Sequence, residues 1–163
     1  MNDEPLTSLS PDLEFSYSQF FVYDAGIKNP ACAWTEQHSR QGFARRDGVV
    51  AIGTLLEFGK AHVTLVLGRP KLDSYERAVC VPLEITSGAV AVDGPDEHPG
   101  IRQMPVESGH YRAVVAQRRA DDSSEVVRIW LEKLDVPSDR SELLIADDGL
   151  DPPNPLVETA SSP

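Results

Sequence analysis

The stretch VCVPLEIT, residues 79–86, carries the clearest indication of the fold. Apolar side chains occupy its odd-numbered positions from Val79 to Ile85, and Cys, Pro, Glu and Thr alternate with them. A period of two places one set of side chains on one face, as in a β-strand with one buried side. Pro82 has no N–H to donate to a neighbouring strand, so we expect this strand to be an edge or to be bulged there.

Similar alternation recurs on both sides of this stretch. The further stretches with a period of two cover residues 15–23, 50–56, 61–67, 90–92, 111–115 and 127–131. In the first of them, Phe15, Tyr17 and Phe21 are expected to share one face of a continuous strand. The turn signal Thr-Ser-Gly at 86–88 predicts that 90–92 is the hairpin partner of the strand before it.

A single short helix is expected before residue 42. Thr35 can cap its start, and Gly42 can end it. The Asp47-Gly48 pair predicts a tight hairpin turn, because glycine tolerates a positive φ. Together these elements predict a mainly β fold. We expect an antiparallel β-sandwich or open barrel of about seven to eight strands, with one short helix and flexible acidic tails.

The chain of 163 residues has room for one ordinary domain. Its net charge of −11 is concentrated at the two ends, because residues 15–134 hold 15 acids and 14 bases. We expect a flexible N-terminal segment at 1–12, a β-sandwich domain at 13–135 and an acidic, proline-rich C-terminal tail at 136–163. Apolar residues in the tail, such as those at 143–145, leave short docking points open.

Composition and charge disfavour several classes of protein. No run approaches the roughly 18 to 20 apolar residues of a membrane span, and residues 1–11 lack the features of a secretory signal, so a cytoplasmic protein is expected. A net negative field opposes direct binding to nucleic acid. Cys32 and Cys80 form no C-x-x-C pair, which favours plain thiols in a reducing compartment.

No catalytic motif is present. The phosphate-binding glycine loops and the nucleophile motif G-x-S-x-G are missing, and no two histidines have the spacing of a local metal site. The residues 93–98 contain Asp93, Asp96, Glu97 and His98, the densest group of metal-ligand types. Two prolines interrupt this group, so a solvated loop is favoured over a metal-assisted hydrolase. The sequence predicts a protein that is not an enzyme and has no cofactor or metal.

Trp130 is the most informative departure from the alternation. Period two places it with Arg128 and Glu132 on the face opposite Ile129. A tryptophan beside an arginine is typical of protein interfaces, because the large ring buries much area at low entropic cost. Trp130, Arg128 and Glu132 are therefore candidates for partner binding. The alternative is that the tail or the first strand covers the ring.

Further partner-binding candidates surround this face. Arg112 of the preceding strand could extend it into a basic stripe with Arg118, and an ordinary solvated sheet face is the alternative. Tyr75 and Trp34 complete the candidate set. With Trp130, these two aromatic residues also support a different function, a β-sandwich module that binds carbohydrate or a lipid surface by stacking.

Several segments resemble the competence protein J family in order and spacing. They are Ser16-Tyr17-Ser18-Gln19-Phe20, Trp34-Thr35-Glu36, Gly42-Phe43-Ala44, Asp47-Gly48, Asp73-Ser74-Tyr75-Glu76-Arg77, Val81-Pro82, and Pro105 with Gly109-His110-Tyr111. The resemblance covers roughly residues 14–134. It implies a mostly β protein without enzymatic activity that binds and blocks a small bacterial DNA-entry nuclease. An acidic inhibitor is suited to this role, because a groove that holds phosphates is cationic.

The resemblance therefore favours an immunity-type inhibitor that occludes the nucleic-acid site of a nuclease. The ligand-binding module for carbohydrate or lipid is the alternative. The resemblance supplies no interface residues, and it does not extend to the acidic tail. An exposed edge strand at 78–86 also leaves the pairing of two copies into a homodimer open.

Overall fold

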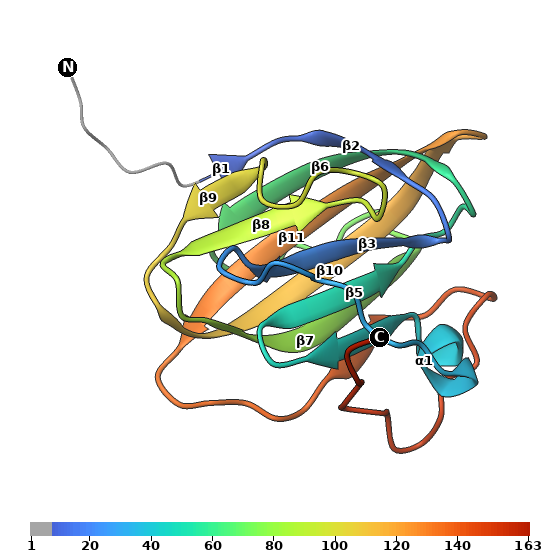
Figure 1. Cartoon of the computed structure of the whole chain (residues 1–163). Coiled ribbons are helices and arrows are strands. Elements are labelled where there is room, and N and C mark those ends of the chain that lie inside the picture. Colours follow the sequence, from blue (N-terminus) through green and yellow to red (C-terminus); the bar gives the residue numbers. More distant parts are fainter. Residues whose placement is uncertain (1–7) are drawn as a thin grey trace.

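A computed structural model describes residues 8–163 and contains two β-sheets that face each other (Figure 1). The larger sheet consists of β1 (Ser8–Leu9), β2 (Asp12–Phe15), β6 (Gly59–Leu67), β7 (Arg77–Ile85), β10 (Gly109–Asp121), β11 (Ser124–Leu134) and β12 (Glu142–Ile145). The smaller sheet consists of β3 (Gln19–Asp24), β4 (Phe43–Arg46), β5 (Val49–Gly53), β8 (Ala89–Asp93) and β9 (Gln103–Pro105). One helix, α1 (Glu36–Gln41), precedes β4.

The order of strands in the larger sheet is β1-β6-β11-β10-β7-β12. β2 also pairs with β6, at residues 59–62, whereas β1 pairs with residues 65 and 66 of the same strand. In the smaller sheet the order is β4-β5-β3-β8-β9. Paired strands are antiparallel except for β6 and β11, which run parallel. The mainly β, two-sheet fold predicted from the alternation is therefore confirmed.

The main core lies between the two sheets. Phe20 and Val22 of β3 enter it from the smaller sheet, and Leu65 of β6 and Ile129 of β11 enter it from the larger one. All four side chains are completely buried. Their spacing of two along each strand is the reason that the sequence pattern identified these segments.

The strand β7 has the environment that its sequence predicts. Its odd-numbered apolar side chains from Val79 to Ile85 are all buried in the core. The whole length of β7 pairs with β10 on one side, whereas on the other side β12 pairs only with Ala78–Cys80. Pro82 lies beyond that short pairing, so its missing N–H interrupts no second ladder.

The predicted helix and hairpin are also confirmed. The Thr35 hydroxyl accepts a hydrogen bond from the backbone N–H of His38, and Gly42 ends α1 with a φ of 86°. Gly48, with a φ of 74°, forms the two-residue connection between β4 and β5 with Asp47.

Three local predictions are wrong. The first strand does not run continuously over 15–23, because Tyr17 and Ser18 have φ values of 57° and 56° and separate β2 from β3. The connection at 86–88 leads not to a hairpin partner of β7 but across to the smaller sheet, where β8 pairs with β3 and β9. Twelve strands are present among residues 8–163, because short strands such as β1, β9 and β12 contain too few residues to show a period.

The buried carboxylate of Asp24 stabilises that crossing between the sheets. It accepts hydrogen bonds from the backbone N–H and the hydroxyl of Thr86, and from the backbone N–H groups of Ser87 and Gly26. Burial by itself would raise the pKa of Asp24, but these hydrogen bonds outweigh it and lower the pKa to about 2.

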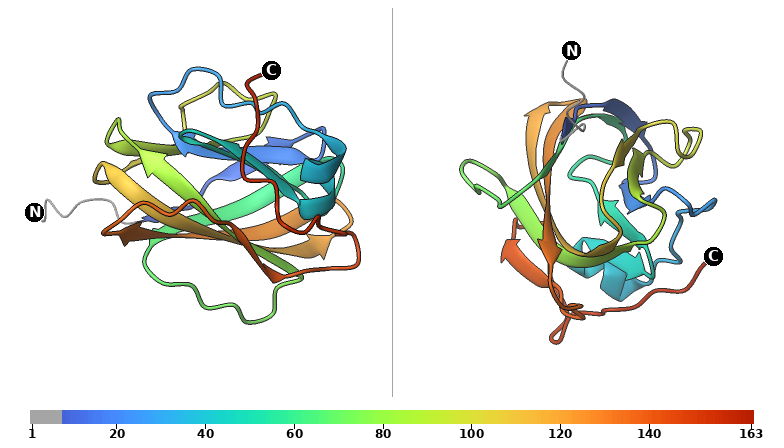
Figure 2. Two further views of the ribbon diagram at one scale, coloured as in Figure 1. Left: turned by 90° about the horizontal axis from the view of Figure 1, so that it is seen from below. Right: turned by 90° about the vertical axis from the view of Figure 1, so that its left-hand side faces the viewer.

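The C-terminal segment, residues 136–163, is not the flexible tail that its composition predicts. It runs along the outside of the domain, adds β12 to the larger sheet and passes over α1 (Figure 2). The Gln41 side chain exchanges two hydrogen bonds with the backbone of Val157, and the backbone N–H of Ala33 donates to Ser161. The composition of the C-terminal segment did not predict this order, because the hydrogen-bond partners of its backbone belong to the domain.

Within the predicted flexible N-terminal segment, residues 1–12, β1 and the start of β2 pair with β6. Residues 1–7 lie outside the described residues. Among residues 8–163, no helix is long and apolar enough to cross a membrane.

Candidate partner-binding site

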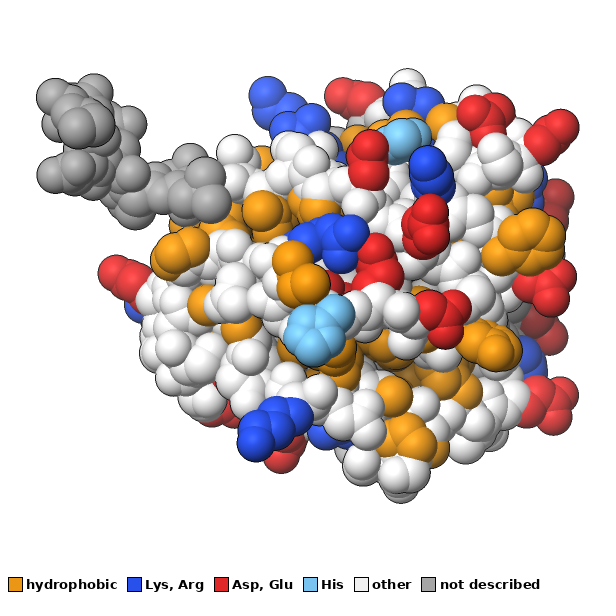
Figure 3. Space-filling model, turned by 45° about the horizontal axis from the view of Figure 1, so that its top comes forward, with side chains coloured by type: hydrophobic (Ala, Val, Ile, Leu, Met, Phe, Trp, Pro, Cys, Tyr) orange, Lys and Arg blue, Asp and Glu red, His pale blue; other side chains and the backbone are white. Residues whose placement is uncertain are grey.

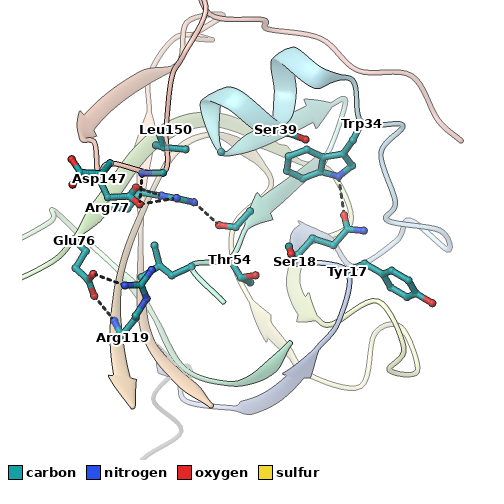
Figure 4. Close-up of a pocket in the computed structure, with 16 residues that line it drawn as sticks. Tyr17, Ser18, Trp34, Ser39, Thr54, Glu76, Arg77, Arg119, Asp147 and Leu150 are labelled. Carbon is teal, nitrogen blue, oxygen red and sulfur yellow. Dashed lines mark hydrogen bonds and ion pairs between the residues drawn. The ribbon is translucent and has the colours of Figure 1, made fainter. Parts of the chain in front are cut away.

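The ends of several strands surround a cleft of about 640 Å³ at one end of the two sheets (Figure 4). Its walls come from the turn at 17–19, Trp34, the second half of α1 with its cap Gly42, the end of β5, the start of β7 and the C-terminal residues 147–150. The cleft therefore joins segments that lie up to 133 positions apart in the sequence.

The central feature of the cleft is the ion pair between Arg77 and Asp147. The guanidinium donates to both carboxylate oxygens, Nε to Oδ1 at 2.6 Å and Nη2 to Oδ2 at 3.1 Å, and Nη1 donates to the Gly53 carbonyl at 3.3 Å. The Arg77 side chain is only 7% exposed. Burial opposes ionisation of Asp147, but the hydrogen bonds and the charge of Arg77 outweigh it and lower the pKa of that carboxyl.

A second pair, Glu76 and Arg119, lies at the mouth of the cleft. The backbone N–H of Arg119 donates to Glu76 Oε2 at 2.6 Å, and the guanidinium is 3.8 Å from Oε1. Both side chains are largely exposed, so this pair contributes little to stability. The four charges of the two pairs cancel, which leaves Asp148 as the unpaired charge among the lining residues.

The turn at Tyr17 and Ser18 forms the opposite wall. Its two positive φ values are costly for residues with a side chain, and such strain persists only where surrounding contacts impose it. Ser18 supplies those contacts, because its N–H donates to the Glu57 carbonyl and its carbonyl accepts from Thr54, both at 2.9 Å. The Tyr17 side chain is 77% exposed and points away from the cleft in Figure 4.

The lining of the cleft includes the hydroxyls of Ser18, Ser39 and Thr54 but no histidine or cysteine. The nearby His38 ring has both nitrogens engaged, Nδ1 with Thr35 and Nε2 with the Thr159 carbonyl. Within residues 8–163, no group of three or more His, Cys, Asp or Glu side chains is placed to hold a metal ion. At the end of β8, Asp93 is buried and accepts hydrogen bonds from the Tyr23 hydroxyl and the Gly100 N–H.

Sequence comparison with known families matches residues 12–136 to competence protein J (ComJ). The chain belongs to the competence protein J family. A curated relative, the DNA-entry nuclease inhibitor of Bacillus subtilis (strain 168), is 28% identical over 83 residues, which are 50% of this chain and 62% of the relative. The match thus spans less than two thirds of that relative's length.

A solved structure supports the fold of this family member. The crystal structure of ComJ from Bacillus subtilis, described as the inhibitor of the DNA-degrading activity of NucA, superposes with a TM-score of 0.68. The superposition covers 80% of this chain and 98% of the other, at 20% identity. The two chains therefore share the fold.

Four of the segments that carry the family resemblance meet at the cleft of this competence protein J relative. The contributing segments are 16–20, 34–36, 42–44 and 73–77, with Tyr17, Trp34, Gly42 and Arg77 among the residues of the walls. The three non-glycine residues with a positive φ in residues 8–163 all lie in the first and last of these segments. By contrast, the wall at 147–150 lies outside the region that matches the family.

The predicted partner-binding residues form two groups. Trp34 lies at the cleft, half-buried, with its Nε1 donating to Gln19 Oε1 at 2.8 Å. The others lie together on the outer face of β10 and β11 and beside it: Trp130, Arg128, Glu132, Arg112 and Tyr75.

Trp130 is only 5% exposed. The Tyr75 ring meets it edge to face with centroids 6.1 Å apart, and Leu144 and Ile145 of the C-terminal segment pack against the same cluster. Of the two interpretations of Trp130, the structure favours a ring covered by the C-terminal segment. Trp130 is thus not an open platform for stacking.

The proposed basic stripe on this face is interrupted. Arg112 lies 3.5 Å from Glu132, and the Arg128 guanidinium lies 5.7 Å from the Trp130 ring centroid. Buried Val114 and Ala116 separate Arg112 from Arg118. The paired charges leave no continuous positive surface along β10.

Sequence reasoning missed Asp147 and the exposure of Tyr17. Asp147 lies 70 positions from Arg77, and no local pattern links them. The two serines that flank Tyr17 were a usable signal, because serine favours turns over strand interiors.

Proposed function

We propose that this protein is an immunity-type inhibitor that binds a small bacterial nuclease of the DNA-entry type and occludes its nucleic-acid site. The observation that carries the proposal is the match of residues 12–136 to the competence protein J family. The curated Bacillus subtilis relative is named an inhibitor of the DNA-entry nuclease. In this proposal the protein acts by binding alone and is not an enzyme.

The physical properties of the chain support this function. A nuclease groove that holds phosphates is cationic, and a protein with a net charge of −11 is attracted to it. Four of the five charged groups of the cleft are paired with each other, an arrangement suited to a rigid binding surface. The proposed location is the cytoplasm, in line with the two buried free thiols, Cys32 and Cys80.

A titration of DNA degradation tests the proposal. NucA from Bacillus subtilis digests labelled duplex DNA while the purified protein is added in increasing amounts. We expect suppression at a near-stoichiometric ratio and weaker suppression at higher salt. A structurally unrelated deoxyribonuclease should remain active, which shows that the protein does not act by removing DNA or metal ions. NucA that stays fully active at a large molar excess would contradict the proposal.

A further inference from the structure

Four connections meet beside the cleft, and they and the strand ends next to them carry a concentration of carboxylates. They are the turn at 16–18, the loop at 54–58, the loop at 94–102 and the turn at 122–123. We call this surface the acidic rim and define it by the aromatic residues Tyr17 and Phe58 and the acids Glu14, Glu57, Asp96, Glu97, Asp121 and Asp122. Phe58 and four of these acids, Glu14, Asp96, Glu97 and Asp121, line a hollow of about 670 Å³. Figure 3 shows acidic side chains gathered around exposed hydrophobic groups on the right of that view.

The charge of the acidic rim is strongly unbalanced. Its six acids are accompanied by two bases, Lys60 and Arg102, which leaves a surplus of four negative charges. Hydrogen bonds from Ser123 and Ser124 lower the pKa of Asp121 and keep it ionised. Among residues 8–163, no base lies within ion-pair distance of the side chains of Glu57 or Asp122.

This surplus exists because of how the rest of the chain is paired. The C-terminal acids Asp147, Asp151 and Glu158 bind three arginines of the domain, Arg77, Arg40 and Arg45. These arginines are therefore engaged away from the acidic rim. The domain balances acids and bases in its sequence, but three of its arginines are paired with the C-terminal segment, while six acids collect at the acidic rim.

Two aromatic side chains protrude among these carboxylates. Tyr17 is 77% exposed and Phe58 is 69% exposed. Single exposed apolar residues are ordinary, but large aromatic rings within a ring of charges have the composition of an interface hot spot. Phe58 also lines the hollow together with Glu14, Asp96 and Asp121.

The acidic rim is held rigidly. Ser18 fixes the Tyr17 turn to the loop at 54–58. The buried carboxylate of Glu125 accepts a hydrogen bond from the Leu56 N–H at 2.8 Å and so anchors the loop that carries Phe58. Gly94 lies so close to the Glu14 carbonyl that a Cβ there would be 1.9 Å from its oxygen, and only glycine permits this approach. Such preorganisation lowers the entropic cost of binding.

We propose that the acidic rim is the surface that enters the cationic nucleic-acid groove of the nuclease. Its carboxylates take the place of phosphates at the basic side chains of the groove, and Phe58 and Tyr17 provide the apolar contacts. This inference rests on the proposed inhibitor function and assigns it to specific residues. The adjoining cleft shares the Tyr17 turn and the loop at 54–58 with the acidic rim, so both belong to one end of the molecule.

Three variants and matched controls test the assignment against NucA from Bacillus subtilis. Phe58→Ala should raise the protein concentration for half-maximal inhibition roughly thirtyfold. The double variant Glu57→Lys with Asp122→Lys should raise it about a hundredfold or more and flatten its dependence on salt. Glu125→Ala leaves the surface residues unchanged but frees the loop, so a smaller loss is expected.

The controls lie at the other end of β11, roughly 30 Å away along that strand of 11 residues. Val136→Ala removes part of another exposed apolar side chain, and Asp135→Lys with Asp139→Lys makes the same change in charge as the double variant. Both controls should inhibit like the unmodified protein. Thermal melting of every variant checks that it is folded.

The outcomes separate the two proposals. If the unmodified protein inhibits NucA and the folded variants of the acidic rim inhibit equally well, the assignment is overturned and the inhibitor function stands. Equal losses in the charge control and in the Glu57, Asp122 variant also overturn it, since net charge alone would then explain binding. If the unmodified protein has no effect on NucA, the proposed function fails, and the assignment fails with it.

Discussion

The β-domain and the C-terminal segment are held by different interactions, although both are ordered. The domain buries a continuous apolar core between its sheets, with residues such as Phe20 and Ile129 completely buried. The segment packs a few apolar side chains, such as Leu143, and is otherwise held by ion pairs and backbone hydrogen bonds. The comparison shows that a polar, proline-rich sequence can be ordered where a preformed surface offers it specific polar partners.

Deletion of residues 136–163 is the most direct test of whether the C-terminal segment stabilises the domain. It uncovers the cluster around Trp130 and removes the carboxylate that pairs with Arg77. We expect the free energy of unfolding to fall by about 4 kcal/mol or more while the β-sheet signal remains. Urea denaturation followed by circular dichroism measures this. A truncated chain as stable as the full one would show that the segment contributes nothing to the domain.

Asp147→Ala isolates the strongest single contact between the two regions. The substitution leaves the Arg77 guanidinium buried and unpaired, so we expect a loss of about 2 to 3 kcal/mol in urea denaturation. The double variant Arg77→Met with Asp147→Leu removes both charges and should recover most of that loss. Equal destabilisation in the single and double variants would argue against an unpaired charge as the cause.

Asp24→Asn removes a buried charge within the domain, and its effect on stability can be compared with that of Asp147→Ala. The carboxyl pKa falls from its usual 3.8 to about 2 on folding, so the ionised group stabilises the protein above pH 4. This contribution, about 2 kcal/mol, is lost as the pH falls toward 2. The stability difference between the unmodified protein and Asp24→Asn should therefore shrink between pH 6 and pH 2. A difference that is independent of pH would show that the charge of Asp24 is unimportant.

Asp151→Ala should have the smallest effect. Its carboxylate lies 3.3 Å from Arg40 and is 87% exposed, so solvent screens the pair. We expect a change below about 0.5 kcal/mol in the same denaturation assay. A loss comparable to that of Asp147→Ala would mean that burial does not decide the strength of these contacts.

Local sequence patterns predicted most of the strands and both caps of the helix. The alternation in β7, the Thr35 cap and the Asp47-Gly48 turn each depend on residues a few positions apart, and each is confirmed. The wrong predictions concern the path of the chain between elements. Residues 86–88 form a turn in either topology, and only the packing of β8 against β3 selects the crossing to the other sheet.

The candidate site depends more on the tertiary structure than the fold does. Of the proposed partner-binding residues, Trp34 lies at the cleft in the structure, whereas Trp130 lies under Tyr75 and the C-terminal segment. Period two correctly identified the sheet face of Trp130, but it carries no information about what covers that face. Phe58 had no pattern to mark it, because it lies in a loop between two strands.

By itself, the sequence determined a mainly β domain with one short helix, and its ordered motifs indicated the competence protein J family. These properties follow from contacts between near neighbours and from a hydrophobic period of two. The tertiary structure decided where charge resides. It pairs domain arginines with acids at least 70 positions away, and it leaves carboxylates from three connections and two strand ends together at one end. Electrostatic interactions depend on distance in space, so a balance of charges along the chain could not reveal this surface.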